Sequence, residues 1–186
     1  SQHSFRRVCK EFYLFDVKIP TYSALCKMRK RIPLPLWKAL LQATCPFRSI
    51  LVSIDSTGFS RTNPSWYYIK RIDRKKPVKS YVKLSSLFDT RRKKFLALKA
   101  RARLRHDVMD IPALLKQRND FNKLVGDSAY DAESVHEKCF HLGIKTVIKP
   151  KKNTKRGFYR RKQRKNYHKK VYNRRSMHES GFSSWK

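Results

Sequence analysis

Three carboxylates stand apart from the other acidic residues of this chain. The sequence holds 46 Lys and Arg residues but only 13 Asp and Glu residues, which gives a formal net charge of +33. Asp55 is the only acid between positions 17 and 72, Glu179 is the only acid from position 138 onward, and Asp127 follows the run 124–126. Isolated carboxylates in a chain that attracts polyanions are typical of ligands for a divalent cation that works on a phosphate backbone.

The charge of the chain indicates its partner. An isoelectric point near 10.6 makes nucleic acid the expected ligand, and binding should weaken steeply with salt because each neutralised phosphate releases counterions. The 186 residues are enough for one domain with a real core, and 12% aromatic residues argue against disorder. A ribosomal or other structural RNA-binding protein remains an alternative on composition alone.

The sequence gives little support for disulfide bonds, a zinc site or a membrane-spanning segment. The four cysteines show no CxxC spacing, which favours reduced, buried thiols in a cytosolic protein. His136, Cys139 and His141 lie at ordinary helical spacing without a recognisable fourth ligand, so we do not expect a zinc site. No segment is long and apolar enough to span a membrane. We therefore expect a cytoplasmic, nucleoid-associated protein without a membrane partner.

The pattern of apolar residues predicts the elements that position the three acids. Period-two and buried apolar runs predict five strands, and helical spacing predicts three helices in the same region. The predicted strands are 50–55, 80–88, 94–102, 121–127 and 144–148, and the predicted helices are 107–115, 131–141 (ended by Gly143) and 171–183. Two basic loops interrupt this order, 60–79 with Trp66, Tyr67 and Tyr68, and 149–170. The order of elements predicts an α/β fold, a mixed five-stranded sheet flanked by helices.

Residues 1–48 form a separate prediction, a small, helical and basic N-terminal segment before a domain that spans 49–186. The segment 20–23 offers an N-cap signal for a helix that starts near Ala24, and Pro33 and Pro35 end that helix before a short one at 36–41. This segment is either a DNA-binding helical module or a cap on the core.

The predicted strands bring two of the acids together. Asp55 and Asp127 each end a core strand, and adjacent strands would place both carboxylates in one crevice, where ligands of open α/β sheets bind. On the last helix, a run of residues at steps of three and four shares one face, namely Tyr172, Arg175, Glu179, Phe182 and Lys186. Three oxygen ligands suit Mg²⁺ or Mn²⁺, and two such ions about 3.5–4 Å apart are typical of phosphodiester cleavage. The alternatives are that the Asp residues only form turns and that the helix presents a solvated face.

These residues resemble a known family, the DDE transposases of prokaryotic insertion sequences. The spacing Tyr172-x2-Arg175-x3-Glu179-x6-Lys186 is similar to the Y-R-E-K signature of that family. The segments 125–131 and 54–58 resemble the blocks around the second and first catalytic Asp, and the similarity extends over about residues 17–186.

The resemblance implies a ribonuclease-H-like catalytic domain that cleaves element ends and transfers strands into target DNA, with Mg²⁺ or Mn²⁺, two ions, as cofactor. It implies that Asp55, Asp127 and Glu179 are the catalytic metal ligands. It also implies DNA-backbone contacts by the signature residues Tyr172, Arg175 and Lys186. We expect the neighbouring Arg174 to contact DNA as well. The partners would be double-stranded DNA, as element end and as target, and a second copy of the chain in a homodimer on DNA.

Two further expectations concern the basic segment 149–175 and the acid Asp107. The segment 149–175 holds fourteen Lys and Arg residues and no acid, and its cations, among them Lys151, Lys152, Arg160 and Arg161, are expected to grip DNA phosphates. Asp107 matches an acidic position of the family before a helix, and we interpret it as an N-cap rather than a metal ligand.

Three functions remain open on the sequence. The chain ends at Lys186, the last signature residue, so we expect the C-terminal region of the family to be missing or very short. The chain is then either an active transposase domain, a truncated remnant or other basic protein that only binds nucleic acid, or a nuclease on the same fold that hydrolyses without joining.

Overall fold

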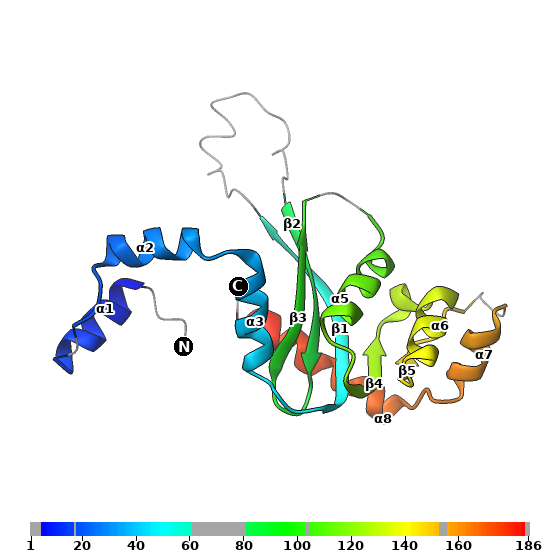
Figure 1. Ribbon diagram of the computed structural model, residues 1–186. Coiled ribbons are helices and arrows are strands. Elements are labelled where there is room, and N and C mark those ends of the chain that lie inside the picture. The colour runs from blue at the N-terminus through cyan, green and yellow to red at the C-terminus, as the bar shows by residue number, and fades with distance from the viewer. Residues whose placement is uncertain (1–4, 17, 61–80, 103–104, 153–155, 185–186) are drawn as a thin grey trace, which may run out of the picture. The chain divides into compact units, whose positions relative to one another are not determined.

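The computed structural model describes residues 5–16, 18–60, 81–102, 105–152 and 156–184 of the chain (Figure 1). It divides into two compact units, residues 1–40 and 41–186. The predicted loop with Trp66, Tyr67 and Tyr68, and Lys186 of the signature, lie outside the described residues. No helix in the described ranges is long and apolar enough to cross a membrane.

The first unit consists of helices. Helices α1 (Phe5–Leu14) and α2 (Tyr22–Arg31) lie within it, and α3 (Leu34–Ala43) begins there and continues into the second unit. The predicted N-cap is confirmed, because the Thr21 side chain accepts a hydrogen bond from the backbone N–H of Ala24 (3.3 Å) at the start of α2.

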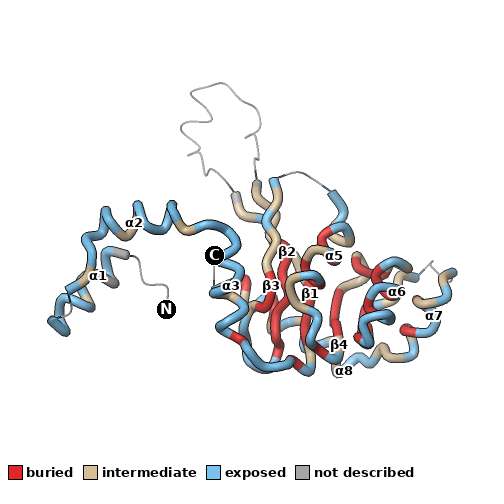
Figure 2. The backbone as a smooth tube through the Cα atoms, viewed as in Figure 1, coloured by how far each residue is buried: buried red, intermediate tan, exposed pale blue. Residues whose placement is uncertain are grey.

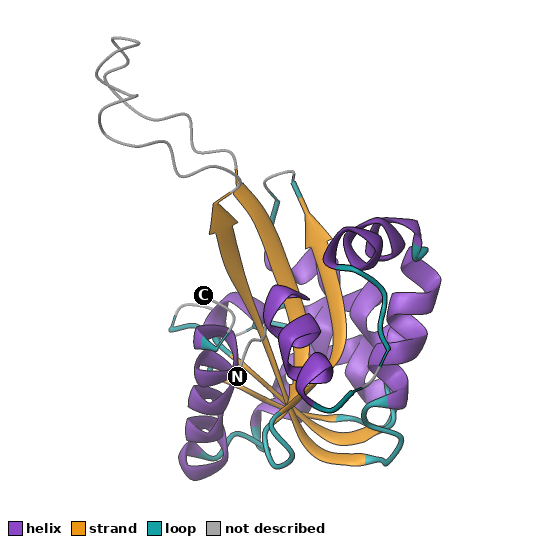
Figure 3. Cartoon of the chain, turned by 90° about the vertical axis from the view of Figure 1, so that its left-hand side faces the viewer, coloured by secondary structure: helices purple, strands orange, loops and turns teal. Residues whose placement is uncertain are grey.

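The second unit is built on the mixed five-stranded sheet that the sequence predicted. Its spatial order is β3-β2-β1-β4-β5, in which β1 pairs antiparallel with β2 and parallel with β4. The strands are β1 (Ser49–Ser60), β2 (Tyr81–Asp89), β3 (Lys94–Arg101), β4 (Phe121–Gly126) and β5 (Lys145–Ile148). Figure 3 shows these twisted strands with helices packed along them.

Helices lie on both faces of this sheet, with α5 in front of it and α9 behind it in the view of Figure 1. The helical elements are η1 (Asp107–Asp110), α5 (Ile111–Gln117), η2 (Ser128–Tyr130), α6 (Glu133–His141), α7 (Phe158–Arg164), α8 (Lys169–Tyr172), η3 (Asn173–Arg175) and α9 (Ser176–Ser183). The prediction that Gly143 ends α6 is confirmed, since Gly143 follows the helix with φ +70°, a conformation that favours glycine.

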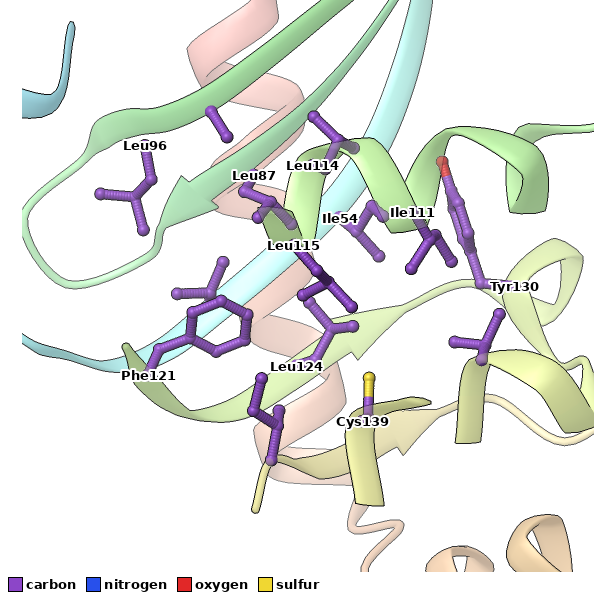
Figure 4. Close-up of a cluster of buried hydrophobic side chains, with 14 of the residues drawn as sticks. Ile54, Leu87, Leu96, Ile111, Leu114, Leu115, Phe121, Leu124, Tyr130 and Cys139 are labelled. Atoms are coloured by element: carbon purple, nitrogen blue, oxygen red, sulfur yellow. The ribbon is translucent and has the colours of Figure 1, made fainter. Parts of the chain in front are cut away.

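Alternation along β1 sends its side chains to two different environments. Ile54 joins Leu87, Leu114 and Leu124 in the apolar core on the α5 face, which Figure 4 shows in close-up. Ser53 and Asp55 therefore point to the opposite face, where α9 packs. The central strands are mostly buried, as Figure 2 shows. The sheet is therefore a rigid base for Asp55 and Asp127, which lie just beyond the paired residues of β1 and β4.

The C-terminal part departs from the predicted elements. The predicted basic loop 149–170 contains α7 and the first two residues of α8, and the single helix predicted over 171–183 is divided among α8, η3 and α9. Helix α7 has no apolar stripe to reveal it, because its buried side chains are the polar Arg160 and Gln163. The periodicity on which the prediction depended is therefore absent from this segment.

Candidate active site

The register of two parallel strands brings Asp55 and Asp127 to the same level of the sheet. Ser53 on β1 pairs with Val125 on β4, and each Asp lies two residues beyond this pair. Both residues are partly buried. The Asp127 side chain accepts a hydrogen bond from Ala129 N (2.9 Å), which orients its carboxylate as the cap of η2. The two acids thus lie just beyond the last paired residues of β1 and β4. The prediction that a strand ends at Asp55 was wrong, because β1 continues to Ser60 through its pairing with β2.

Glu179 is connected to this pair through Arg175. The Arg175 Nη1 atom donates to Asp55 Oδ2 (3.1 Å) and its Nη2 atom donates to Glu179 Oε1 (2.6 Å). The guanidinium also interacts electrostatically with Asp127 and lies near Tyr172. Asp55, Asp127 and Glu179 therefore surround one positive charge, although they come from three separate segments of the chain.

The pKa of Asp55 reports how these acids affect one another. Burial raises its pKa most, the Ser56 N–H and the Arg175 guanidinium lower it, and the Asp127 and Glu179 carboxylates raise it again. The pKa ends above its usual value. Neighbouring like charges disfavour ionisation, so this group of acids would gain from a further cation.

The chemistry of this donor set fits a hard divalent cation. In the described part of the chain, no three His, Cys, Asp or Glu side chains are already arranged to hold a metal ion. Here Arg175 lies between Asp55 and Glu179 instead. Carboxylate oxygens are the ligands that Mg²⁺ and Mn²⁺ prefer, and a cation would offset both the burial of the Asp55 carboxylate, which raises its pKa most, and its repulsion by Asp127 and Glu179.

A second acidic group lies beside Asp55 and was not predicted. Ser56 donates through its Oγ to Asp107 Oδ2 (2.8 Å), and Asp107 also pairs with Lys83 and with Arg101 Nη2 (2.7 Å). The N-cap interpretation of Asp107 was wrong, because His106 occupies the cap position of η1 and makes no side-chain capping bond. The Asp107 carboxylate instead accepts a hydrogen bond from the hydroxyl of Ser56, the residue after Asp55, while the cations of Lys83 and Arg101 balance its charge.

His178 attaches the helix that carries Glu179 to the sheet. Its side chain is fully buried, with Nδ1 2.9 Å from Ser53 Oγ on β1 and Nε2 2.7 Å from Ser86 Oγ on β2. The ring stacks on Phe88 (centroids 5.1 Å apart) and on Phe182 (4.6 Å). Phe182 is therefore a core residue and does not flank Glu179 on an exposed face as the sequence predicted. No spacing rule could identify this histidine clamp, because its partners lie 92 and 125 residues away.

The residues predicted to contact DNA occupy different environments. Lys152, Arg161 and Arg174 are exposed, Lys151 is half-buried, and Tyr172 is half-buried with its ring 5.7 Å from that of Tyr167. These positions are open to a polyanion, and their contacts with DNA stay a prediction.

Arg160 is the exception among the predicted DNA contacts. It is buried, and its guanidinium donates to Asp131 Oδ1 (3.0 Å), to Asp131 O (3.0 Å) and to Arg156 O (2.8 Å). All three nitrogens are thus used inside the protein. The predicted phosphate contact by Arg160 is corrected to a structural role, because forming it would require breaking a buried ion pair.

Two acids of the α6 region fix the basic helix α7. The Glu133 carboxylate accepts hydrogen bonds from Tyr159 N (2.8 Å) and Arg160 N (3.1 Å), so it caps α7 from outside the helix. Asp131 adds a bond from Lys151 N (2.8 Å). Gly157, with φ +115°, leaves space for the Glu133 carboxylate. These contacts fix helix α7, and with it the position of the basic residues that the helix carries.

Comparison with known proteins adds one finding. A family model described as the transposase DDE domain matches residues 46–186, a range that includes Asp55, Asp127 and Glu179. No curated protein matches the chain.

Proposed function

The chain belongs to the transposase DDE domain family, and we propose that it catalyses metal-dependent cleavage of DNA at element ends followed by strand transfer into target DNA. The family implies DNA as the substrate, and a mixed sheet flanked by helices is the ribonuclease-H-like fold expected for it. The observation that carries the proposal is the adjacency of Asp55 and Asp127, with Glu179 joined to them through Arg175.

Each acid has a role in this mechanism. Asp55, Asp127 and Glu179 would hold Mg²⁺ or Mn²⁺, as two ions, which when bound activate the attacking oxygen and stabilise the leaving oxygen of the phosphodiester. The β1–β4 pair fixes the two Asp carboxylates, and the contacts of His178 with Ser53 and Ser86 fix the helix that bears Glu179. Preorganised ligands do not have to be collected during the reaction, which lowers its barrier.

Cations around the acids would bind the DNA backbone. Lys152, Arg161 and Arg174 are exposed, and no ion pair involves them within the described ranges. The net charge of +33 would attract a duplex over a distance comparable to the Debye length. We propose that Tyr172, Lys151 and Lys186 add contacts near the cleaved phosphate, and that two copies of the chain bring two DNA ends together.

Nicking of supercoiled plasmid with Mn²⁺ or Mg²⁺ tests the proposal. Asp127→Asn should abolish nicking, while its amide oxygen can still accept the Ala129 N–H bond and keep the fold. Asp120→Asn is the matched control, because Asp120 is exposed, precedes the other end of β4 and pairs there with Arg118. Nicking that survives in Asp127→Asn, or that is equally lost in Asp120→Asn, would contradict the assignment.

A second readout separates transposition from hydrolysis. Incubation of a labelled element end with a target plasmid should yield a joined product if the chain is a transposase. Nicks without any joined product would favour a nuclease on the same fold. Binding of DNA by the wild type without nicking would favour a remnant that acts only as a binding protein.

A further inference from the structure

The guanidinium of Arg175 connects two of the candidate metal ligands, Asp55 and Glu179. Its two terminal nitrogens bond to Asp55 Oδ2 and to Glu179 Oε1, and Asp127 is a further electrostatic neighbour. The Arg175 side chain is only 23% exposed and that of Asp55 only 17%, so this pair is shielded from water. A guanidinium thus neutralises part of the charge that a divalent cation would neutralise.

The Arg175 bridge and a bound metal ion compete for the same carboxylates. The oxygens that accept the two N–H groups are oxygens that a metal ion would bind, and a divalent cation would lie within a few ångströms of the guanidinium charge. At that separation two cations repel strongly in a partly buried site. The geometry therefore favours one occupant at a time.

The contacts of Arg175 differ from those of an arginine with a structural role. Arg160 donates to two backbone carbonyl oxygens in addition to a carboxylate, and these carbonyls hold it regardless of any metal. In the described ranges, the hydrogen bonds of the Arg175 guanidinium all go to side-chain carboxylates. One of these partners, the Glu179 side chain, is 55% exposed and so is free to reorient.

We propose that Arg175 is a displaceable counter-cation, which holds Asp55 and Glu179 together in the metal-free protein and leaves them when a divalent cation binds. The proposal rests on the function proposed above for these acids. Displacement frees the guanidinium for a DNA phosphate next to the bound ion. Metal binding would in this way also prepare the site for DNA, and Arg175 would act as a positioning residue in both states.

The test measures Mn²⁺ affinity without DNA, by calorimetric titration of the metal-free protein. In the wild type, Mn²⁺ must break two charge-assisted hydrogen bonds, and these belong to the stronger class. Arg175→Gln should therefore bind Mn²⁺ about tenfold more tightly than the wild type. Arg175→Lys keeps the charge but cannot span both carboxylates, so it should bind with intermediate affinity and serves if the Gln variant does not fold.

Arg174→Gln controls for charge alone. Arg174 is the neighbouring residue, it is exposed, and no ion pair involves it in the part of the chain that the structure describes. This variant should change the Mn²⁺ Kd by less than about twofold, because a screened surface charge contributes little. Equal tightening in both Gln variants would overturn the proposal, since long-range charge would then explain the effect.

The outcomes distinguish this inference from the proposed function. If the wild type binds Mn²⁺, Asp127→Asn does not, and Arg175→Gln binds no more tightly than the wild type, the displacement is refuted while the metal site stands. If the wild type itself shows no Mn²⁺ binding at millimolar concentration, both the metal site and the displacement are refuted.

Discussion

Acid should destabilise this protein through one buried histidine. His178 is fully buried between Ser53 and Ser86, and one of its ring nitrogens accepts a hydrogen bond only while the ring is neutral. Burial, with the Arg175 guanidinium nearby, lowers the pKa of His178 to about 3. The same side chain in the unfolded chain has a pKa near 6.5.

The sign and the size of the effect follow from these two values. Between pH 6.5 and pH 3 the unfolded chain binds a proton that the folded protein does not bind, so stability falls as the pH falls. Above pH 6.5 the contribution of His178 to stability is fully present. Each pH unit costs about 1.4 kcal/mol, which gives about 2 kcal/mol at pH 5 and about 5 kcal/mol at pH 3. This loss is comparable to the whole stability of a marginal domain.

Urea unfolding of the metal-free protein between pH 7.5 and pH 4.5 measures this loss. The reference is a triple variant, His178→Leu with Ser53→Ala and Ser86→Ala, in which an apolar side chain replaces the ring and no hydroxyl is left without a partner. Other titrating groups are common to both proteins and cancel in the difference. The wild type should lose about 2 kcal/mol more than the variant between pH 6.5 and pH 5. Parallel pH dependence of the two proteins would refute the assignment of a neutral buried His178.

Four further predictions concern packing and charge. Gly157→Ala should cost about 2–4 kcal/mol in urea unfolding, because a Cβ would lie 2.1 Å from the carboxylate that caps α7 and φ is +115°. Gly181→Ala should cost about 1–3 kcal/mol in the same assay and reduce plasmid nicking, because its Cβ would lie 2.8 Å from the Phe88 ring and displace α9. Arg161→Gln should leave stability unchanged and reduce the slope of log K for duplex binding against log salt by about 0.9, measured by fluorescence anisotropy. Arg160→Gln should instead lose about 3–5 kcal/mol of stability, as for any broken buried pair.

The strands and the adjacency of two acids could be predicted because their causes are local. The strand 50–55 was predicted from a mostly apolar run whose centre, 52–54, is buried, and Gly143 ends a helix by its own conformational freedom. Parallel neighbours end at the same edge of a sheet, so Asp55 and Asp127 are expected together once both strands are assigned. The structure extends β1 to Ser60 because pairing with β2 continues beyond the apolar run.

The remainder of the site could not be predicted because it depends on partners that are distant in the sequence. Arg160 and Arg161 are adjacent and chemically identical, yet Asp131 makes one a structural residue while the other is exposed. In a chain with 46 basic residues, composition cannot select which cations are already paired. Only the folded contacts make that distinction, and they limit the proposed DNA-binding surface to a subset of the cations.

The histidine clamp explains how so short a helix can hold Glu179, the proposed third metal ligand, in place. Helix α9 has eight residues, and its buried side chains are His178 and Phe182. Apolar contact of that extent is not directional and would allow α9 to slide or rotate on the sheet. Two hydrogen bonds from adjacent strands fix its register, and a neutral ring adds no charge next to Glu179. A buried lysine or arginine at this position would compete with the proposed metal ion for the acids, as we propose for Arg175, without being free to leave.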